Sequence, residues 1–309
     1  MIAVVGSYGA GLTMRTDRMP VAGETLSSGV FSAGHGGKGS NQAVAAARLG
    51  SEVSFLTAIG EDDFGVQAVG LWREAGIDAS HVVRTDAATM VAVILVEPSG
   101  ENRIVIAPGA LDRLTPGHVD AFAAKIASSR LLVVSLEIPL PVAMAALKTA
   151  REAGVPTLLN PAPAQKLPTR VWEWVDVFTP NASEMRTVLG LDPDAAVAED
   201  DLVDELRQVY SGAVVVTLGS GGALVDDGVR RFRVPPVAID EVVDTTGAGD
   251  AFTGALAHRL ESGDGLEAAV KVAAAAGAYS VGLAEVIPSI PTTTQLNNFK
   301  AKYGDAEES

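Results

Sequence analysis

The sequence has no cysteine and few aromatic residues. Among its 309 residues there is no Cys, and only 5% are Phe, Trp or Tyr. Without a thiol, a disulfide framework, a cysteine nucleophile and a cysteine–zinc site are all excluded. The four histidines, His35, His81, His118 and His258, show no metal-ligand spacing. Alanine and glycine are abundant by contrast, which suits close packing of helices on a sheet.

The sequence also lacks a long uncharged hydrophobic run and an excess of basic residues. Its longest apolar tract, residues 266–287, is alanine-rich and contains Glu267, Lys271 and Glu285, so it predicts a buried helix and not a membrane span. The chain opens with apolar residues 2–5 and no basic stretch, which predicts a strand and not a signal peptide. The net charge of −15 disfavours nucleic acid and anionic membranes as partners. We expect a cytoplasmic protein with no nucleic-acid or membrane partner.

Short apolar runs alternate with helical patterns along most of the chain, in which 48% of residues are hydrophobic. The runs that predict buried strands are residues 2–5, 53–58, 131–135, 157–160, 175–179 and 213–218. The patterns that predict helices are residues 40–49, 66–75, 141–153, 183–190 and 202–210. This alternation predicts an α/β fold with a mainly parallel central sheet and helices on both of its faces.

Two stretches interrupt this alternation. Residues 13–33 contain Pro20 and Gly23 with alternating patterns, and residues 90–106 predict a hairpin. We expect these two stretches to form a small β-sheet apart from a core made of residues 1–12, 34–89 and 107–295. Residues 296–309 are expected to form a C-terminal tail, of which the polar part, residues 300–309, is expected to fray.

The stretch 243–252, with the sequence VDTTGAGDAF, is the most informative motif of the chain. Gly247, Ala248 and Gly249 let backbone N–H groups form a concave anion-binding nest. The small residues that follow predict a helix, whose positive end favours a phosphate at the nest. Asp250, in the first helical turn, is a candidate general base for phosphoryl transfer. The alternative is a plain turn with Asp250 as a helix cap.

A second glycine-rich motif, GGKGSNQA, occupies residues 36–43. Three glycines around Lys38, ahead of a predicted helix, indicate a backbone that approaches a ligand closely. The alternatives are a solvated surface lysine and an ordinary N-terminal cap at Asn41. His35 adjoins this turn and has either a structural role or a substrate contact.

Two further motifs follow predicted strands. Residues 179–184, TPNASE, form a capping box of Asn181 and Glu184 at the start of a helix. Residues 217–222, TLGSGG, form a glycine turn at the carboxyl end of a strand, where open α/β sheets place ligands. The glycines at 6–11 have the spacing G-x-x-G-x-G and no helix pattern after them, which disfavours a dinucleotide-binding site. The P-loop pattern is absent, because Lys38 is followed by Gly39.

The motifs at 36–43 and 244–250 resemble the N-terminal and C-terminal signatures of the ribokinase family of sugar and nucleoside kinases. The resemblance runs from about residue 2 to residue 291 and includes Gly23-Glu24-Thr25 and residues 160–164, NPAPA. It implies a three-layer α/β/α fold with a small β-sheet lid over the sugar site. It also implies ATP, Mg²⁺ and K⁺ or another monovalent cation as ligands, and a homodimer formed through the lid.

The resemblance assigns roles to individual residues. It implies that Asp250 is the base and that Gly247, Ala248 and Gly249 form the anion hole. The sugar contacts that it implies are Gly37, Lys38, Asn41, Glu137 and Asp250. The nucleotide contacts that it implies are Asn181, Glu184, Thr217, Gly219, Gly222 and Gly249, with Glu184 organising Mg²⁺ through water. The monovalent-cation positions that it implies are Asp244, Thr246, Ser280, Leu283, Glu285 and Ser289.

The sequence departs from the family pattern at the sugar end. Gly9 and Gly11 stand where the family has an Asn and an Asp that bind ribose hydroxyls, and Leu111 replaces an Asn. Glu285 replaces a residue that is usually small, so the cation site is altered or a carboxylate partly substitutes for it. We expect an ATP-dependent kinase acting on a primary hydroxyl of ribose or a related pentose, ketose or polyol. The alternatives are a nucleoside kinase and a ligand-binding protein without turnover.

Overall fold

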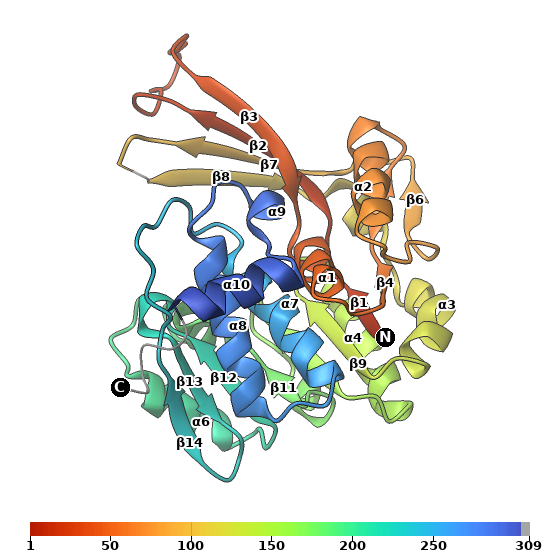
Figure 1. The fold of residues 1–309 in the computed structure, drawn as a ribbon. Coiled ribbons are helices and arrows are strands. Elements are labelled where there is room, and N and C mark those ends of the chain that lie inside the picture. The colour runs from red at the N-terminus through yellow and green to blue at the C-terminus, as the bar shows by residue number, and fades with distance from the viewer. Residues whose placement is uncertain (100, 304–309) are drawn as a thin grey trace.

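Apolar strands form a sheet through the centre of the protein (Figure 1). The structure is a computed structural model that describes residues 1–99 and 101–303. The strands, in the order of the sheet, are β14 (Arg231–Val234), β13 (Ala223–Asp226), β12 (Ala213–Thr217), β11 (Val177–Phe178), β10 (Thr157–Asn160), β9 (Leu131–Ser135), β1 (Ile2–Val5) and β4 (Val53–Leu56). β13 pairs antiparallel with both β12 and β14, and the other neighbouring strands of this sheet pair in parallel. The carboxyl ends of the parallel strands therefore lie at one edge.

Helices cover both faces of the sheet, because the strand side chains alternate between two hydrophobic cores. Ile2 and Val4 lie in one core, and Ala3 and Val5 lie in the other. The first core is covered by α1 (Lys38–Arg48), α2 (Asp63–Glu74), α7 (Ala248–Glu261), α8 (Leu266–Ser280) and α10 (Thr293–Tyr303). The second is covered by α3 (Pro116–Ala127), α4 (Leu140–Glu152), α5 (Ala182–Val188) and α6 (Glu199–Arg207). The result is the three-layer α/β/α fold that the sequence predicts.

Small residues let α1 and α7 pack closely against each other. A Cβ at Gly254 of α7 would lie only 2.4 Å from Ala45 Cβ and 2.6 Å from the carbonyl oxygen of Gln42 on α1. Gly254 therefore allows a contact between helices that lie about two hundred residues apart in the sequence. This contact brings the first turns of the two helices together at the carboxyl edge of the sheet.

The two stretches that interrupt the alternation form one small sheet, which stands apart from the main body in Figure 1. Its strands are β3 (Val30–Gly36), β2 (Gly9–Arg15), β7 (Met90–Val96) and β8 (Asn102–Ala107), in that order. It extends a few residues beyond the expected 13–33 and 90–106, and residue 100 of the hairpin lies outside the described residues. A short parallel pair, β5 (Ala58–Gly60) and β6 (Val83–Thr85), lies beside α2.

Three expected strands, at 2–5, 131–135 and 157–160, have the bounds that the sequence predicts. The expected strand 53–58 is instead divided into β4 and β5 at Thr57. The expected long helix 266–287 ends at Ser280, and the short helix α9 (Val286–Ser289) follows it. The expected fraying is wrong for residues 300–303, because these belong to the last turn of α10. Residues 304–309 of the tail lie outside the described residues.

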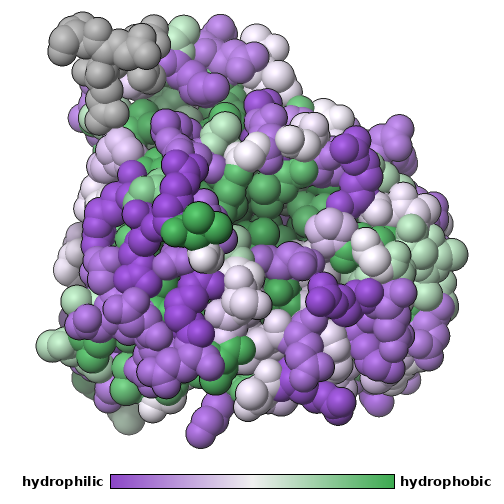
Figure 2. All heavy atoms as spheres, turned by 90° about the horizontal axis from the view of Figure 1, so that it is seen from below, coloured by the Kyte–Doolittle hydropathy of each residue, from purple (hydrophilic) through white to green (hydrophobic). Residues whose placement is uncertain are grey.

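No helix in the described ranges is both long enough and apolar enough to cross a membrane. Figure 2 shows the face that lies away from the small sheet. It is covered mainly by hydrophilic side chains around a smaller area of hydrophobic ones.

Candidate functional site

The first turn of α7 holds the predicted anion-binding nest. Gly247 caps the helix with φ 81° in the left-handed region, and a Cβ there would lie 2.5 Å from Val286 Cγ1, so both conformation and space require glycine. The N–H of Ala248 donates to the carbonyl of Thr245 at 3.3 Å. Within the described residues, the N–H groups of Gly247 and Gly249 have no backbone acceptor. These two amides are therefore available to an anion at the positive end of the helix.

Gly249 differs from Gly247 in its backbone conformation. Its φ is not in the left-handed region, and no atom lies within 4 Å of the position that a Cβ would take. The residue has a helical backbone and borders open space, which is part of a cavity. A side chain at this position would therefore occupy the space in front of the nest without straining the backbone.

Asp250 reaches from α7 to α1. Its side chain is buried, with 7% of its surface exposed. Its Oδ2 accepts a hydrogen bond from Asn41 Nδ2 at 2.8 Å, and its Oδ1 accepts one from Gln42 Nε2 at 3.0 Å. The alternative that Asp250 merely caps the helix is wrong, because Gly247 is the cap and no side-chain cap bond is present.

The glycine turn before α1 packs on the end of β1. A Cβ at Gly37, which has φ 87°, would lie 2.5 Å from the Cα of Tyr8, and one at Gly39 would lie 2.6 Å from the backbone of Gly6. These glycines are thus required by contacts within the protein, whereas the sequence suggested close approach to a ligand. The turn fixes Glu137 as well, whose Oε2 accepts hydrogen bonds from the N–H of Lys38 at 3.0 Å and from the hydroxyl of Ser7.

Lys38 lies between three carboxylates. Burial by itself lowers the pKa of its ammonium group, but the charges of Asp250, Glu137 and Glu184 outweigh burial and raise the pKa above its usual value. Lys38 therefore stays positively charged at neutral pH. A fixed cation at this position can hold an anionic group close to Asp250.

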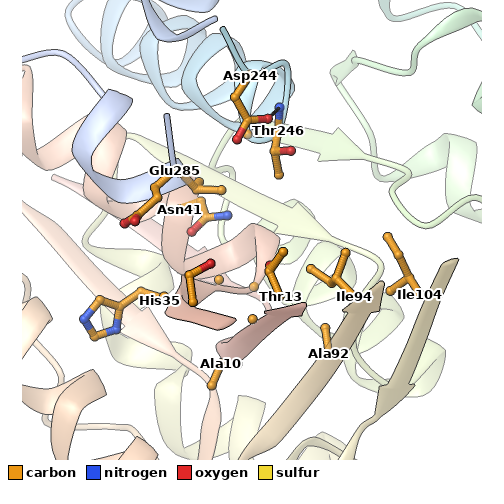
Figure 3. A pocket seen from close by; sticks show the side chains of 18 of the residues that line it. Ala10, Thr13, His35, Asn41, Ala92, Ile94, Ile104, Asp244, Thr246 and Glu285 are labelled. Carbon is orange, nitrogen blue, oxygen red and sulfur yellow. Dashed lines mark hydrogen bonds between the residues drawn. The ribbon is translucent and has the colours of Figure 1, made fainter. Parts of the chain in front are cut away.

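Two cavities meet at Asp250. The first has a volume of about 540 Å³, and Gly37, Lys38, Asn41 and Glu137 are among the residues that line it. Figure 3 shows Asn41 in this cavity. The second has a volume of about 220 Å³. Both are lined by Lys38, Thr245, Gly247 and Asp250. Two ligands bound in these cavities would thus approach each other at the carboxylate of Asp250.

The inner face of the small sheet forms one wall of the first cavity. Strand pairing places Gly9, Gly11 and Thr13 of β2 beside Met90, Ala92 and Ile94 of β7. Gly9 and Gly11 therefore lie in a strand, and they leave this wall without polar side chains next to Asn41. Figure 3 shows Thr13, Ala92, Ile94 and Ile104 along this side of the cavity.

Two other residues noted in the sequence, Leu111 and His35, are held by contacts within the protein. Leu111 belongs to the second hydrophobic core, with 2% of its surface exposed, and does not line the first cavity. His35 does line it, but its Nδ1 is paired with the hydroxyl of Tyr8 at 2.9 Å. The ring of His35 is thereby held by a buried neighbour, which favours a structural role.

The second cavity is lined by polar groups at the carboxyl ends of strands. Asn181 and Glu184 form the predicted capping box, with hydrogen bonds of 2.8 Å in both directions. Burial raises the pKa of Glu184, and the lowering effects of the Asn181 N–H and the Lys38 charge do not fully offset it. Thr217 lines the cavity too, paired with Asn181 through a β-bridge.

The remaining predicted nucleotide residues lie outside this cavity. Gly219 and Gly222 line neither cavity. Gly222 has φ 81°, and a Cβ there would lie 2.1 Å from the carbonyl oxygen of Val234, so the turn between β12 and β13 requires glycine. Its role in the structure is therefore to shape the turn that follows Thr217.

The predicted cation positions come from two segments that are hydrogen-bonded together. The N–H groups of Val243 and Asp244 donate to the carbonyl of Val281 at 2.8 and 3.2 Å. Asp244, Thr246 and Glu285 line the first cavity, whereas Ser280, Leu283 and Ser289 line neither. The hydroxyls of Ser280 and Ser289 donate to nearby carbonyls, at 2.9 and 2.8 Å. The described residues contain no cluster of three or more His, Asp or Glu side chains placed to hold a metal ion.

Glu285 has an unusual backbone conformation. With φ 66° and ψ 154°, it is the only non-glycine residue of the described ranges at positive φ. This region is essentially restricted to glycine, and occupying it costs on the order of 1–3 kcal/mol. In Figure 3 its side chain extends toward His35 and away from Asp244. Its carboxylate is thus not directed at the predicted cation position.

Comparison with known proteins identifies the family. A family model described as pfkB family carbohydrate kinase matches residues 1–293. The chain belongs to this family. The ribokinase of Lactococcus lactis is 34% identical over 307 residues, with 99% of this chain and 98% of the relative covered. The deoxyribokinase of Salmonella typhimurium is 36% identical over 305 residues, with 96% and 98% covered.

Two further similarities extend this result. A bifunctional ribokinase/ribose-5-phosphate isomerase A of Fructilactobacillus sanfranciscensis is 35% identical over 303 residues, and this chain spans 55% of its length. The structure of Arabidopsis thaliana ribokinase complexed with ribose and ATP matches with a TM-score of 0.90 at 28% identity, covering 96% of this chain and 97% of that one. The fold is therefore the ribokinase-like α/β fold, and the chain is a sugar kinase of the pfkB family.

Three residues of the site were not assigned a role from the sequence. Gln42 contacts Asp250, and Asn160 and Thr179 line the second cavity. Gln42 and Asn160 lie inside stretches that resemble the family, but only the fold shows that they meet. The hydroxyl of Thr179 is buried and has no partner in the described part of the chain.

Proposed function

We propose that this sugar kinase transfers the γ-phosphoryl group of ATP to a primary hydroxyl of a small sugar. The observation that carries the proposal is the position of Asp250, at the junction of the two cavities and in the first turn of α7. A carboxylate at this junction can accept a proton from a hydroxyl in the first cavity while the nest holds a phosphate in the second. The relatives named ribokinase and deoxyribokinase support this assignment.

The reaction is an in-line displacement. Asp250 accepts the proton of the sugar hydroxyl, and the oxygen attacks the γ-phosphorus of ATP. The bond between the γ-phosphorus and the oxygen that bridges it to the β-phosphate breaks, and ADP leaves with this oxygen. The free N–H groups of Gly247 and Gly249 stabilise the transferring group at the positive end of α7, and Ala248 between them keeps the two amides in one helical turn. Lys38 offsets negative charge between the cavities.

The residues of the second cavity fit a nucleotide and Mg²⁺. Lys38, the free amides of α7 and the unpartnered hydroxyl of Thr179 are donors for phosphate oxygens. Glu184 uses one carboxylate oxygen in the capping box, and its other oxygen can bind a water of hydrated Mg²⁺. Bound there, Mg²⁺ would neutralise phosphate charge. The similar Arabidopsis ribokinase is complexed with ATP, which supports a nucleotide as the ligand of this cavity.

A monovalent cation, with K⁺ as the first candidate, fits beside the nest only through Asp244 and backbone carbonyls. The hydrogen bonds to Val281 hold Asp244 against the loop that follows α8. A carboxylate and carbonyl oxygens are suitable ligands for such a cation. Replacing KCl by the chloride of a bulky organic cation in the assay tests this part of the proposal, and unchanged turnover would contradict it.

We propose ribose or a related pentose, ketose or polyol as the substrate. Gly37, Lys38, Asn41 and Glu137 line the first cavity and are placed to bind its hydroxyl groups. The two relatives named ribokinase and deoxyribokinase are 34% and 36% identical to this chain, so sequence identity does not separate their substrates. The missing side chains at Gly9 and Gly11 favour a sugar that differs from ribose at the hydroxyls facing β2.

We propose further that the small sheet is a lid and that two copies associate through it in the cytoplasm. Its outer face is apolar, because strand pairing aligns Leu12, Val93 and Val105, and Phe31 lies on the neighbouring strand. Val105 is 71% exposed and Phe31 58% exposed. Light scattering should give the mass of a dimer, and Val105→Lys should give a monomer. A monomeric mass for the unmodified protein would contradict the association.

A coupled assay of ADP release tests the main proposal. The purified protein is supplied with ATP and Mg²⁺ and screened against pentoses, hexoses, polyols and nucleosides. We expect a free sugar or polyol to give the highest kcat/KM and Asp250→Asn to remove the activity. Faster turnover of nucleosides would favour a nucleoside kinase. Binding of sugar and ATP by calorimetry without ADP release would favour a binding protein without turnover.

A further inference from the structure

A chain of side-chain amides connects Asp250 to the central sheet. Gln42 Nε2 lies 3.0 Å from Asp250 Oδ1 and 3.1 Å from Asn160 Oδ1. Asn160 Nδ2 in turn donates to the carbonyl oxygen of Thr179 at 2.8 Å. Gln42 belongs to α1 and Asp250 to α7. Asn160 is the last residue of β10, and Thr179 follows β11 directly. All four are buried, and the exposed fraction of Gln42 is 1%.

The carbonyl of Thr179 determines how both amides are oriented. A carbonyl oxygen only accepts hydrogen bonds, so the amino group of Asn160 must face it and the oxygen of Asn160 must face Gln42. Gln42 must therefore present its amino group, which has two hydrogens, one for Asn160 and one for Asp250. Reversing either amide would bring two donors or two acceptors together in a buried place. The orientation of the donor at Asp250 is thus set by the backbone of the sheet.

We infer that Gln42 is a positioning residue for the catalytic carboxylate, and that Asn160 acts on Asp250 through Gln42. Gln42 lines neither cavity, so its effect on a ligand must pass through the two cavity residues to which it donates, Asp250 and Asn160. Asn41 holds the other oxygen of the carboxylate at 2.8 Å. The two donors on α1 together fix the plane of the carboxylate between the sugar hydroxyl and the nest. This inference rests on the proposed role of Asp250 as the base.

The position of a base matters because proton transfer requires a short and well-aligned contact with the hydroxyl. A misplacement of about 1 Å can reduce turnover by roughly 100-fold. The substitution Gln42→Met keeps the length of the side chain and removes both donors. The carbonyl oxygen that it also removes has no partner in the described part of the structure, so no other contact is lost. We expect kcat to fall roughly 10- to 100-fold with little change in KM for the sugar.

A second variant gives a readout that a structural role would not affect. Gln42→Glu keeps the shape of the side chain and places a second carboxylate beside Asp250. Because two adjacent carboxylates disfavour ionisation of both, the acid limb of the kcat/KM profile should move to higher pH. Ser40→Ala is the matched control, since Ser40 is a buried residue of α1 whose hydroxyl accepts from Trp72 Nε1 at 2.9 Å. It should lower the melting temperature and leave the pH profile unchanged.

The contribution of Asn160 is tested by a double-mutant cycle. Asn160→Leu should lower kcat in the wild-type background and have no further effect on kcat when Gln42 is already Met. Additive effects would show that Asn160 acts independently and would overturn the connection. Unchanged kcat in folded Gln42→Met, or an unmoved pH profile in Gln42→Glu, would overturn the positioning role. A wild-type protein without ADP release from any sugar would instead refute the proposed function.

Discussion

We expect the single substitution Gly11→Asp to improve the use of ribose by this enzyme. A Cβ at Gly11 would have Gly34 O and Ile94 Cδ1 as its nearest neighbours, both 3.9 Å away, which is ordinary contact. A Cβ at Gly9 would lie 2.3 Å from Met90 Cε and 2.9 Å from the carbonyl oxygen of Met90. Neither glycine has a positive φ. The wall therefore accepts the Asp of the family at position 11, whereas an Asn at position 9 requires Met90 to move.

The size of the gain follows from the hydrogen bond that the new carboxylate can make. A hydrogen bond to a charged group contributes about 1.5–3 kcal/mol. If it forms with a ribose hydroxyl in the ground state and the transition state, kcat/KM for ribose rises about 10- to 150-fold, mainly through a lower KM. The new carboxylate also adds negative charge to a cavity that already contains Glu137 and Asp250, and this repulsion reduces the gain.

The assay compares kcat/KM for ribose and for the best substrate of the screen in wild type, Gly11→Asp and Gly11→Asn. Gly34→Asp is the matched control, because Gly34 faces Gly11 on the neighbouring strand and has no atom within 4 Å of its Cβ position. It adds the same charge one strand further away, so it should give a smaller gain. The reasoning is refuted if wild type already prefers ribose with a micromolar KM, or if folded Gly11→Asp shows no gain for ribose.

Three further substitutions test the catalytic role of Asp250, the backbone strain at Glu285 and the stability that Asp62 provides. Asp250→Asn should lower kcat at least about 100-fold, and stability should also fall by about 1–3 kcal/mol because an amide hydrogen then faces a donor on α1; near-normal turnover would exclude Asp250 as the base. Glu285→Gly should raise the free energy of unfolding by about 1 kcal/mol in urea titrations, because relief of the strain at φ 66° outweighs the flexibility that glycine adds to the unfolded chain; a less stable variant would contradict this. Burial of Asp62 raises its pKa, but the hydrogen bonds that it accepts from Thr89 and Gly65 together lower the pKa by more. The pKa of Asp62 therefore lies below its usual value. The stabilisation by Asp62 is therefore complete at neutral pH and is lost as the pH falls from about 4 through the pKa of the folded state. Asp62→Asn should flatten the acid side of the curve of melting temperature against pH, and an unchanged curve would count against this role.

The sequence predicts the centre of the fold well because its strands are buried on both faces. Runs such as Ile2–Val5 and Leu131–Ser135 are apolar at every position or nearly so, so their ends are clear. The edge of the sheet has a different pattern, since β14 reads Arg231-Phe232-Arg233-Val234 and its arginines pair with acidic residues of α6. This strand was not predicted. β14 is partly exposed at the surface, so arginines interrupt its apolar pattern, and the lysines of α10 occur for the same reason.

The phosphate side of the site could be predicted because it is local in the sequence. Gly247, Gly249 and Asp250 lie in one helical turn, so their spacing alone implies a nest with a carboxylate beside it. The support of that carboxylate could not be predicted in the same way. Gln42 and Asp250 are 208 residues apart, and their contact depends on Gly254 allowing α7 to approach α1.

The sugar cavity differs from the phosphate side in that glycines, which have no side chain, form part of its wall. Gly9 and Gly11 lie in β2, on the face of the small sheet that lines the first cavity. The machinery for phosphoryl transfer is held by α1, α7 and the central sheet, none of which contacts the Cβ position of Gly11. A side chain added there enters the sugar cavity alone. With the uncharged variant Gly11→Asn, substrate preference should therefore change while the pH profile of kcat, which depends on Asp250, stays the same.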